Sequence, residues 1–408
     1  MVSENKISHL IAPSHSCLYI VFSILIAQMA YIFVITGGSF KALVIAQGIF
    51  IIGTNLIFIF KIHELNFSIY NLSVWFILGI IIFLNIIINI GNYSEINDEY
   101  RFAAAHMGAI LGAAFVVQWA AENLEIKVLL EVLAWTVAPL IFYAFILGAY
   151  ILIEKDRFFP LGIHPNWWGE LAFGFVVCSL ALRKKSIKII FITFGIFLMY
   201  LVQSRGALLA AIMTIVVQYF FNLRPFDKSS ITRMIFTCLI IFLITVICFF
   251  VGWLMPIIVF LEENILFLKD PLRGLGTGLT NRLEGWIHAK EIFYENPIFG
   301  QGIDTLGDVH NGFLRMAAEG GIIFIGVIVI LIVSSMIDAW KKRNDIIFSI
   351  LFGIIAYFFT YPRMLNLNIV GIIFLITLFK WKQSMAFEKS KYDKAKKEDE
   401  NKIIKNLQ

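Results

Sequence analysis

Long apolar stretches alternate with short polar connectors along most of the chain. A helix needs about 20 apolar residues to cross the hydrocarbon core of a membrane. The stretches therefore predict an all-α fold, a polytopic integral membrane helical bundle of about 12 transmembrane helices. The predicted spans cover residues 18–36, 42–60, 68–90, 102–121, 128–153, 168–182, 187–203, 206–221, 234–255, 319–338, 346–360 and 366–379.

Composition supports a membrane protein and excludes a large soluble domain. Of the 408 residues, 60% are hydrophobic and 15% are charged, whereas soluble domains are nearer half apolar and a quarter charged. The first apolar run is longer than the usual core of a cleaved signal peptide and has no small-x-small cleavage site, so we expect a retained span. We predict one transmembrane domain over 1–379 and a Lys-rich cytoplasmic tail over 380–408.

The distribution of Lys and Arg predicts the orientation, because positive residues are enriched in cytoplasmic connectors. With both termini in the cytoplasm, every dense basic cluster lies inside, including Arg183 to Lys185, Lys341 to Arg343 and the tail. Residues 256–318 then form the one long loop, on the periplasmic side, and we expect it to contain short helices. Long ordered loops are usually functional, so this loop is the first place to look for chemistry.

Several kinds of chemistry are missing from the sequence. The four cysteines lie in or beside apolar runs without metal-ligand spacing, and they imply no disulfide framework. There is no Asp-x-Asp pair, no phosphate-binding Gly-rich loop ending in Lys-Ser/Thr, and no His-Glu-x-x-His. We therefore expect no metal site, no cofactor and no nucleic-acid partner.

The first candidate site residue is Arg205, which stands with Gln203, Ser204 and Gly206 between two apolar runs. A guanidinium stays charged in proteins and costs about 2.5–3.5 kcal/mol at the bilayer centre on insertion scales. One interpretation is that Arg205 lines a polar cavity and binds a phosphate, which suits its donor geometry. The alternative is that Arg205 reaches the outer headgroups from a tight turn permitted by Gly206.

The long loop supplies Arg282 and Trp286. Asn281 and Glu284 match a capping box that would open a helix, and Asn296-Pro297 would close it. Arg282 and Trp286 would share one face near the helix N-terminus, where anions are favoured. The alternative is an amphipathic helix at the membrane surface with Trp286 at headgroup level.

The third candidate region begins at His310 and runs into the tenth apolar stretch. A histidine at this position can accept a proton from a hydroxyl, although a lone histidine at a helix start is more often a cap or surface residue. Asn311, Arg315 and Glu319 follow at spacings of four, so they would lie along one helical face. His164, beside Trp167 and Trp168 on the outer side, could line the path of a glycan.

Together these segments resemble the O-antigen ligase and O-antigen polymerase superfamily of bacterial membrane glycosyltransferases. The motifs are Gln203-Ser-Arg-Gly-Ala-Leu208 at the start of a span and Arg282 with Trp286 in a periplasmic loop. Glu295-Asn-Pro-Ile-Phe-Gly-Gln-Gly302, His310-Asn-Gly-Phe-Leu314 and Glu319-Gly-Gly follow in order. By motif the resemblance covers about residues 200 to 325, and by topology and length the whole chain.

The resemblance implies a C-type, metal-independent glycosyltransferase in the bacterial inner membrane. Its donor would be a glycan on undecaprenyl diphosphate, and its acceptor a lipid A-core sugar in a ligase or another glycan in a polymerase. Arg205 and Arg282 would hold the diphosphate, and His310 would act as the base. Trp286, Asn311, Arg315 and His164 are further candidates for substrate binding.

The residues themselves allow the same chemistry, because two arginines that bind a departing diphosphate more tightly as its charge grows lower the barrier without a metal. Backside attack would invert the anomeric carbon. A ligase is preferred over a polymerase. A transporter or flippase of lipid-linked glycan stays open, although no inverted repeat supports it, and so does a non-catalytic assembly subunit, in which the candidate residues would be scattered.

Overall fold

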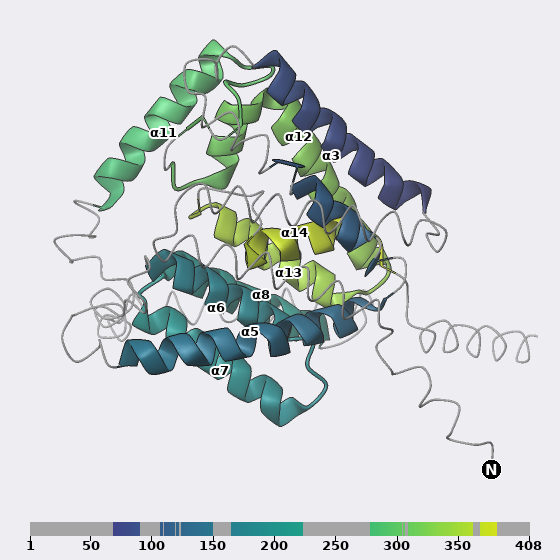
Figure 1. Cartoon of the computed structure of the whole chain (residues 1–408), viewed down its shortest axis with the longest axis vertical. Coiled ribbons are helices and arrows are strands. Elements are labelled where there is room, and N and C mark those ends of the chain that lie inside the picture. Colours follow the sequence, from purple (N-terminus) through teal and green to yellow (C-terminus); the bar gives the residue numbers. More distant parts are fainter. Residues whose placement is uncertain are drawn as a thin grey trace, which may run out of the picture.

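The computed structural model describes residues 68–89, 107–108, 110–118, 120–121, 124–149, 165–222, 278–303, 305–306, 309–361 and 368–381. Within these ranges the regular structure is helical, without strands (Figure 1). The helices are α3 (Ile69–Ile88), α5 (Ile126–Ala149), α6 (Pro165–Ser179), α7 (Lys185–Leu201), α8 (Arg205–Asn222), α11 (Gly278–Glu295), α12 (Gly312–Lys341), α13 (Asp345–Phe358) and α14 (Ile369–Leu378).

Eight predicted spans coincide with these helices, which confirms the all-α character of the fold. In the described part of the chain, α3 and α12 are long and apolar enough to cross a membrane, and α8, α13 and α14 are shorter apolar helices. The runs at 18–36, 42–60 and 234–255 lie outside the described residues, so the number of twelve spans stays a prediction. The tenth predicted span, 319–338, lies within α12, which begins earlier, at Gly312, and has a kink at Gly321.

Helices α8 and α13 form a tightly packed antiparallel pair. Gly206 at the start of α8 lies against Thr360, just beyond the end of α13. In the middle of the pair, Gly353 lies against Thr214, and at the opposite end the rings of Phe221 and Phe348 are 5.0 Å apart. A Cβ on either glycine would lie within about 2 Å of the facing threonine hydroxyl, so the small residues set the closeness of this contact.

Helix α6 lies in the centre of the bundle, in contact with α5, α7, α8 and α14. Nearly all its residues are buried, including Phe173 and Phe175. The predicted span 168–182 is thus a short internal helix. Because it is surrounded by helices rather than lipid, its low hydrophobicity is compatible with burial.

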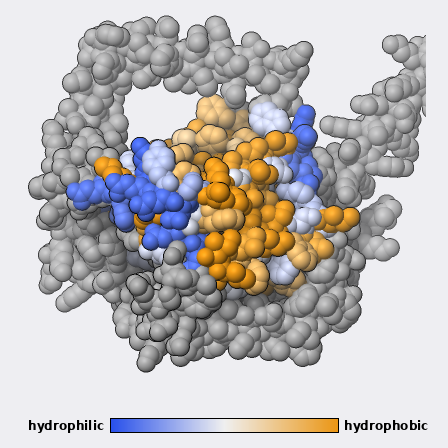
Figure 2. All heavy atoms as spheres, turned by 90° about the horizontal axis from the view of Figure 1, so that it is seen from above, coloured by the Kyte–Doolittle hydropathy of each residue, from blue (hydrophilic) through white to orange (hydrophobic). Residues whose placement is uncertain are grey.

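Large apolar side chains remain exposed on α3 and α12. They include Ile80 and Phe83 on α3 and Val329 and Ile330 on α12. Seen from above, orange hydrophobic residues form a broad field beside a hydrophilic strip (Figure 2). Contiguous apolar surface of this kind marks contact with lipid or another protein, and helices that combine it with a long apolar sequence fit a membrane protein.

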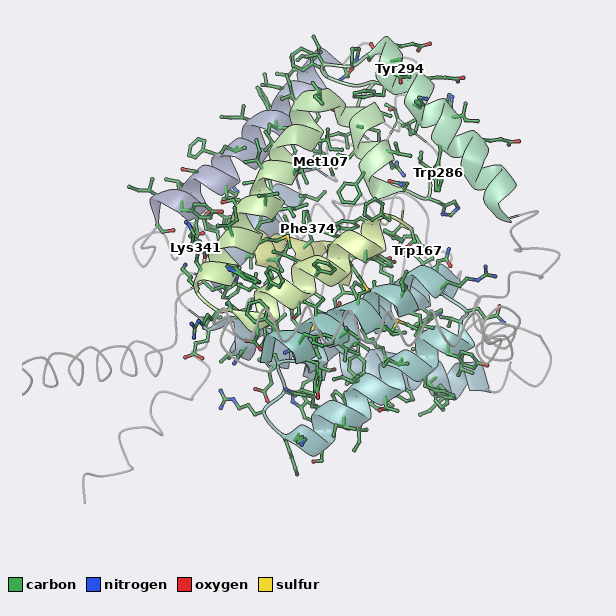
Figure 3. The ribbon with its side chains drawn as sticks, turned by 180° about the vertical axis from the view of Figure 1, so that it is seen from behind. Met107, Trp167, Trp286, Tyr294, Lys341 and Phe374 are labelled. Carbon is green, nitrogen blue, oxygen red and sulfur yellow. The ribbon has the colours of Figure 1, made fainter. Side chains whose placement is uncertain are left out.

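The bundle has two chemically different ends. Trp167 and Trp286 lie on one side in Figure 3, and Lys341 lies on the opposite side. The starts of α8 and α12 and the end of α13 meet at the tryptophan side. The basic turns at 183–185 and 341–343 belong to the opposite side, which the distribution of charges predicts to be cytoplasmic.

Candidate functional site

Arg205 is the first residue of α8 and follows a tight turn that ends α7. The N–H of Gln203 donates to Tyr200 O (3.0 Å), and the N–H of Ser204 donates to Met199 O (3.1 Å). These two bonds form a Schellman motif, whose left-handed residue is usually glycine. Here that residue is Gln203, with φ of 54°. The left-handed turn residue is therefore Gln203, three residues before Gly206, and Arg205 is half-buried at the helix start.

Two glycines hold this turn against neighbouring helices. Gly169 of α6 lies so close to Ser204 that a Cβ there would be 2.2 Å from the serine hydroxyl. Gly206 lies against Thr360, as described above. Arg205 is therefore fixed between the start of α6 and the end of α13.

Next to Gly169 is a buried carboxylate that the sequence analysis did not single out. Glu170 is 2% exposed, and its Oε2 accepts a hydrogen bond of 2.7 Å from the Tyr361 hydroxyl. That hydroxyl also lies 3.4 Å from Asn368 Nδ2. In the sequence, Glu170 is a lone acidic residue near the start of an apolar run. Ionisable residues in such runs often serve a function.

His310 precedes α12 and lies near the same end of α13. It has a positive φ of 50° and is half-buried. Asn311 is the N-cap, since its Oδ1 accepts from the N–H groups of Phe313 and Leu314. The ring of Phe313 lies 5.0 Å from that of Phe359. The predicted binding residue Asn311 thus has a structural function at the helix start, and the left-handed backbone sets the orientation of His310.

Helix α11 packs on the start of α12 and on the segment before it. Trp286 and Ala289 of α11 belong to a small apolar cluster with Val309, Leu314 and Ala318. The Trp286 Nε1 is buried and has no hydrogen-bond acceptor in the described part of the structure. Trp286 is therefore adjacent to the chain that carries His310.

The predicted start of α11 was wrong. The helix begins at Gly278, so Asn281 lies inside it and is not the N-cap, and Arg282 is in its second turn. The predicted end before Asn296-Pro297 is confirmed, since α11 ends at Glu295. The side chain of Arg282 and the whole of His164 lie outside the described residues.

Helix α12 is broken at Gly321, where φ is 68°. The turn after α11 fills the break. The N–H groups of Ile322 and Ile323 donate to Pro297 O and Ile298 O, while Ala318 O and Glu319 O accept from Gln301 and Gly302. Four bonds to residues 297–302, which we call the wedge, thus take the place of helical bonds at the break.

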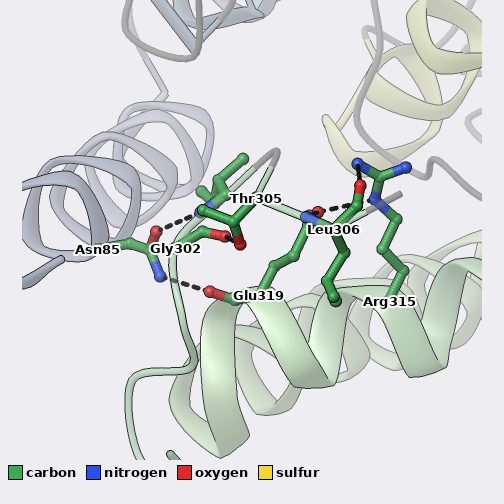
Figure 4. A network of polar contacts seen from close by, with 7 residues as sticks. Asn85, Gly302, Thr305, Leu306, Arg315 and Glu319 are labelled. Carbon is green, nitrogen blue, oxygen red and sulfur yellow. Dashed lines mark hydrogen bonds and ion pairs between the residues drawn. The ribbon is translucent and has the colours of Figure 1, made fainter. Parts of the chain in front are cut away.

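Asn85 of α3 binds the wedge from the other side (Figure 4). Its Nδ2 donates to Phe299 O (2.9 Å) and Glu319 O (3.0 Å), and its Oδ1 accepts from the N–H of Ile303 (3.0 Å). Asn85 is only 3% exposed. The sequence analysis missed it because a single Asn in an apolar run carries little signal without knowledge of the facing chain.

Arg315, predicted to bind substrate, is instead engaged inside the protein. It is 4% exposed, its Nε lies 2.8 Å from Glu319 Oε1, and an NH₂ group donates to Leu306 O (2.8 Å). Glu319 Oε1 also accepts from the Leu306 N–H (3.2 Å). The pair thus holds the chain between the wedge and His310, which favours a structural role for Arg315.

The starts of α8 and α12 therefore meet around the end of α13, and α11 packs on the start of α12 next to His310. Among the described residues no group of three His, Cys, Asp or Glu side chains could hold a metal ion.

Comparison with known protein families identifies this region. Residues 189–331 match a family model described as O-antigen ligase. Over this segment the chain is similar to O-antigen ligases. The matched segment includes Arg205, Arg282 and His310, and it covers about a third of the chain. No curated protein matches the chain.

Proposed function

We propose that the protein is an O-antigen ligase-type glycosyltransferase that moves a glycan from undecaprenyl diphosphate to a lipid A-core sugar on the periplasmic face of the inner membrane. The observation that carries the proposal is the family match over 189–331, which spans all three candidate catalytic residues. The packing supports it, because the elements that carry Arg205 and His310 meet at the end of the bundle opposite the basic turns.

In the proposed reaction, Arg205 and Arg282 bind the diphosphate of the donor. An acceptor hydroxyl attacks the anomeric carbon, a carbon–oxygen bond forms on one face, and the bond to the diphosphate oxygen breaks on the other. The hydroxyl proton passes to His310, and the negative charge left on the diphosphate is stabilised by the two arginines. The anomeric configuration is inverted, and no metal takes part.

Glu170 has a supporting part in this proposal. It lies one residue from Gly169, which contacts the turn that carries Arg205. A buried carboxylate near that turn would balance the arginine charge before the donor binds, and an unpaired charge in a membrane is costly. The Tyr361 hydroxyl fixes the carboxylate by its hydrogen bond.

The test is to express single variants in a deletion strain. Gels then measure how much lipopolysaccharide carries polymer on its core. Arg205→Ala and His310→Ala should each lower transfer at least about a hundredfold, the scale of a lost acid–base or charge contact, with normal accumulation in the membrane. Lys184→Ala, at the exposed opposite end, is the control and should retain full activity. Full activity of Arg205→Ala or His310→Ala would remove that residue from the mechanism.

His310→Gly separates chemistry from backbone effects. Glycine adopts the positive φ of this position without strain, so it preserves the turn but removes the imidazole. An inactive His310→Gly variant supports a chemical role, whereas an active one would show that the position matters only for the turn.

The deletion strain itself distinguishes the alternatives. A core without polymer, with lipid-linked polymer still present outside, indicates a ligase. A core that bears a single repeat unit indicates a polymerase that joins lipid-linked units. Retention of lipid-linked glycan on the cytoplasmic side would indicate a transporter. The elements that carry Arg205 and His310 meet at one end of the bundle rather than at mid-depth, which favours an enzyme over that last function.

A further inference from the structure

The end of the bundle opposite the candidate site contains a cavity of about 230 Å³. Three segments that are far apart in the sequence form it: the start of α5, the corner between α12 and α13, and the end of α14. We call it the basic pocket. Its lining includes Lys127, Lys342, Arg343 and Lys380. Drug-sized ligands occupy pockets of about 300–1,000 Å³, so this one suits a smaller group such as a lipid headgroup.

The basic pocket is lined by four basic residues and three acidic ones, so its acidic residues leave a net positive charge of one. The carboxylate of Asp338 lies 2.9 Å from Lys342 Nζ and 4.0 Å from Lys380 Nζ, so one negative charge is shared between two positive ones. Asp345 lies in the first turn of α13, where its charge also interacts with the helix dipole. Glu125, the third acidic residue, is exposed to solvent.

Lys127 and Arg343 carry the remaining positive charge. Both are exposed, and neither makes an ion pair within the part of the chain that the structure describes. Lys188 of α7 interacts electrostatically with Lys127, Asp345 and Glu131, so one further ammonium group and one further carboxylate lie near the pocket. The local excess of positive charge would attract an anion.

Arg343 occupies a position that favours glycine. It has φ of 54° and is the left-handed residue of a Schellman motif, in which Arg343 N–H donates to Trp340 O and Asn344 N–H donates to Ala339 O. A non-glycine residue there costs conformational energy. The side chain must therefore contribute something that glycine lacks, and in this pocket it contributes a planar donor group suited to phosphate.

The inner wall of the basic pocket is apolar, with Ile126, Ile347, Phe379 and Trp381 all buried. The indole of Trp381 is fixed by its hydrogen bond to Ile376 O (2.7 Å). An apolar wall beneath a basic opening matches an amphiphile whose phosphate meets the charges and whose first acyl methylenes meet the wall. Basic pockets between transmembrane helices are known to bind anionic lipid headgroups.

We propose that the basic pocket binds a phosphate-bearing anion of headgroup size, supplied either by an anionic phospholipid or by a soluble phosphate ester. This site is separate from the proposed glycan-transfer site, since the pocket lies at the opposite ends of α12 and α13. In the proposed orientation it faces the cytoplasmic leaflet.

The experiment uses the full chain in nanodiscs of phosphatidylcholine, with or without cardiolipin. Native mass spectrometry counts retained cardiolipin, and thermal unfolding reports stabilisation. The test variant is Lys127→Gln with Arg343→Asn, because asparagine tolerates the left-handed backbone. The control is Lys184→Gln with Lys185→Gln, which removes two exposed charges at the same end that do not line the pocket.

We expect cardiolipin to bind the wild type and the control equally, and to bind the test variant about tenfold to a hundredfold more weakly, as expected for two lost charged contacts. Equal loss in both double variants, or no loss in either, would overturn the proposal. Lys127→Glu, a change at an exposed side chain, provides a second variant if the first fails to fold, and it should also reject cardiolipin.

Inorganic phosphate and glycerol 3-phosphate, added to phosphatidylcholine nanodiscs, test the soluble source. The pocket is assigned to a soluble phosphate if either compound stabilises the wild type but not the test variant against thermal unfolding, and if the wild type retains no cardiolipin. Neither result depends on glycan transfer, so the proposed function and this inference can fail independently.

Discussion

Arg315 and Arg343 are the same type of residue at opposite ends of α12, but their surroundings differ completely. Arg315 is buried and bound to Glu319 and to a backbone carbonyl, whereas Arg343 is exposed at the mouth of a cavity. A buried arginine in an ion pair uses its positive charge to stabilise the fold. An exposed arginine without an ion pair leaves its charge available to a ligand. Residue type and helical spacing therefore do not distinguish an arginine that is open to a ligand from one that holds a loop.

Helix α3 shows the same contrast through two buried amides. Asn85 binds the wedge at the candidate-site end. Asn71, at the other end, donates to Lys380 O (3.1 Å) and accepts from Lys380 N–H (2.8 Å) beside the basic pocket. The two residues are 14 positions apart, or about 21 Å along a helix. Each amide fixes one end of α3 to backbone groups of a distant segment.

The largest effect is expected from Gly321→Ala. A Cβ there would lie 2.2 Å from Ile298 O, and the residue would also have to adopt positive φ. The wedge would be expelled and its four hydrogen bonds lost, so we expect little folded protein. Yield of monodisperse protein in detergent measures this. Gly326→Ala, on the same helix with open space around its Cβ, is the control and should fold normally. Normal yield of Gly321→Ala would show that the wedge is not needed for folding.

The next effect concerns the buried pair. Arg315→Met or Glu319→Leu alone should destabilise the protein by about 3–5 kcal/mol, because each leaves a buried partner unsatisfied. Arg315→Met combined with Glu319→Leu should cost much less than the sum. Thermal unfolding of the four proteins completes the double-mutant cycle. If the losses add, the two side chains act independently and Arg315 is again a candidate for substrate binding.

Asn85→Ala and Asn71→Ala should each lower the free energy of unfolding by a smaller amount, about 1–3 kcal/mol, since each removes buried hydrogen bonds. The two variants should differ in activity. Asn85→Ala loosens the segment before His310 and should lower glycan transfer, whereas Asn71→Ala should leave transfer unchanged at permissive temperature. Unfolding and transfer are measured on the same preparations. Equal losses of transfer in both variants would mean that α3 acts only as a general support.

The sequence predicted the helices well but predicted their contacts poorly. Apolar length alone located α3, α8 and α13, because hydrophobic helices are specified locally. The break at Gly321 and the role of Asn85 depend on groups from residues 297–303, more than 200 positions from Asn85, and no local pattern encodes that pairing. The capping box at Asn281 was misleading for a local reason. A helix can begin before its best capping residue when the preceding residues also favour a helix.

The prediction for the candidate site has a comparable limit. The motif around Gln203 indicated a turn with an arginine at its edge, and the structure contains that turn. Arg315 and Asn311 were chosen by spacing, yet their partners turned out to be Glu319, Leu306 and the first N–H groups of α12. Spacing indicates which residues share a face, but only the fold decides whether that face is directed to a ligand or to the interior.

The wedge also restricts how the loop helix can move. The wedge follows α11 almost directly, and its backbone is hydrogen-bonded to α12 through Pro297, Gln301 and Gly302, so the C-terminal end of α11 is anchored to α12. If α11 moves to admit a bulky substrate, it must rotate about its C-terminal end. Arg282 lies 13 residues away from Glu295, about 20 Å along the helix. Arg282 would therefore undergo a large displacement, while Trp286, which is nearer the C-terminal end of α11, would undergo a smaller one.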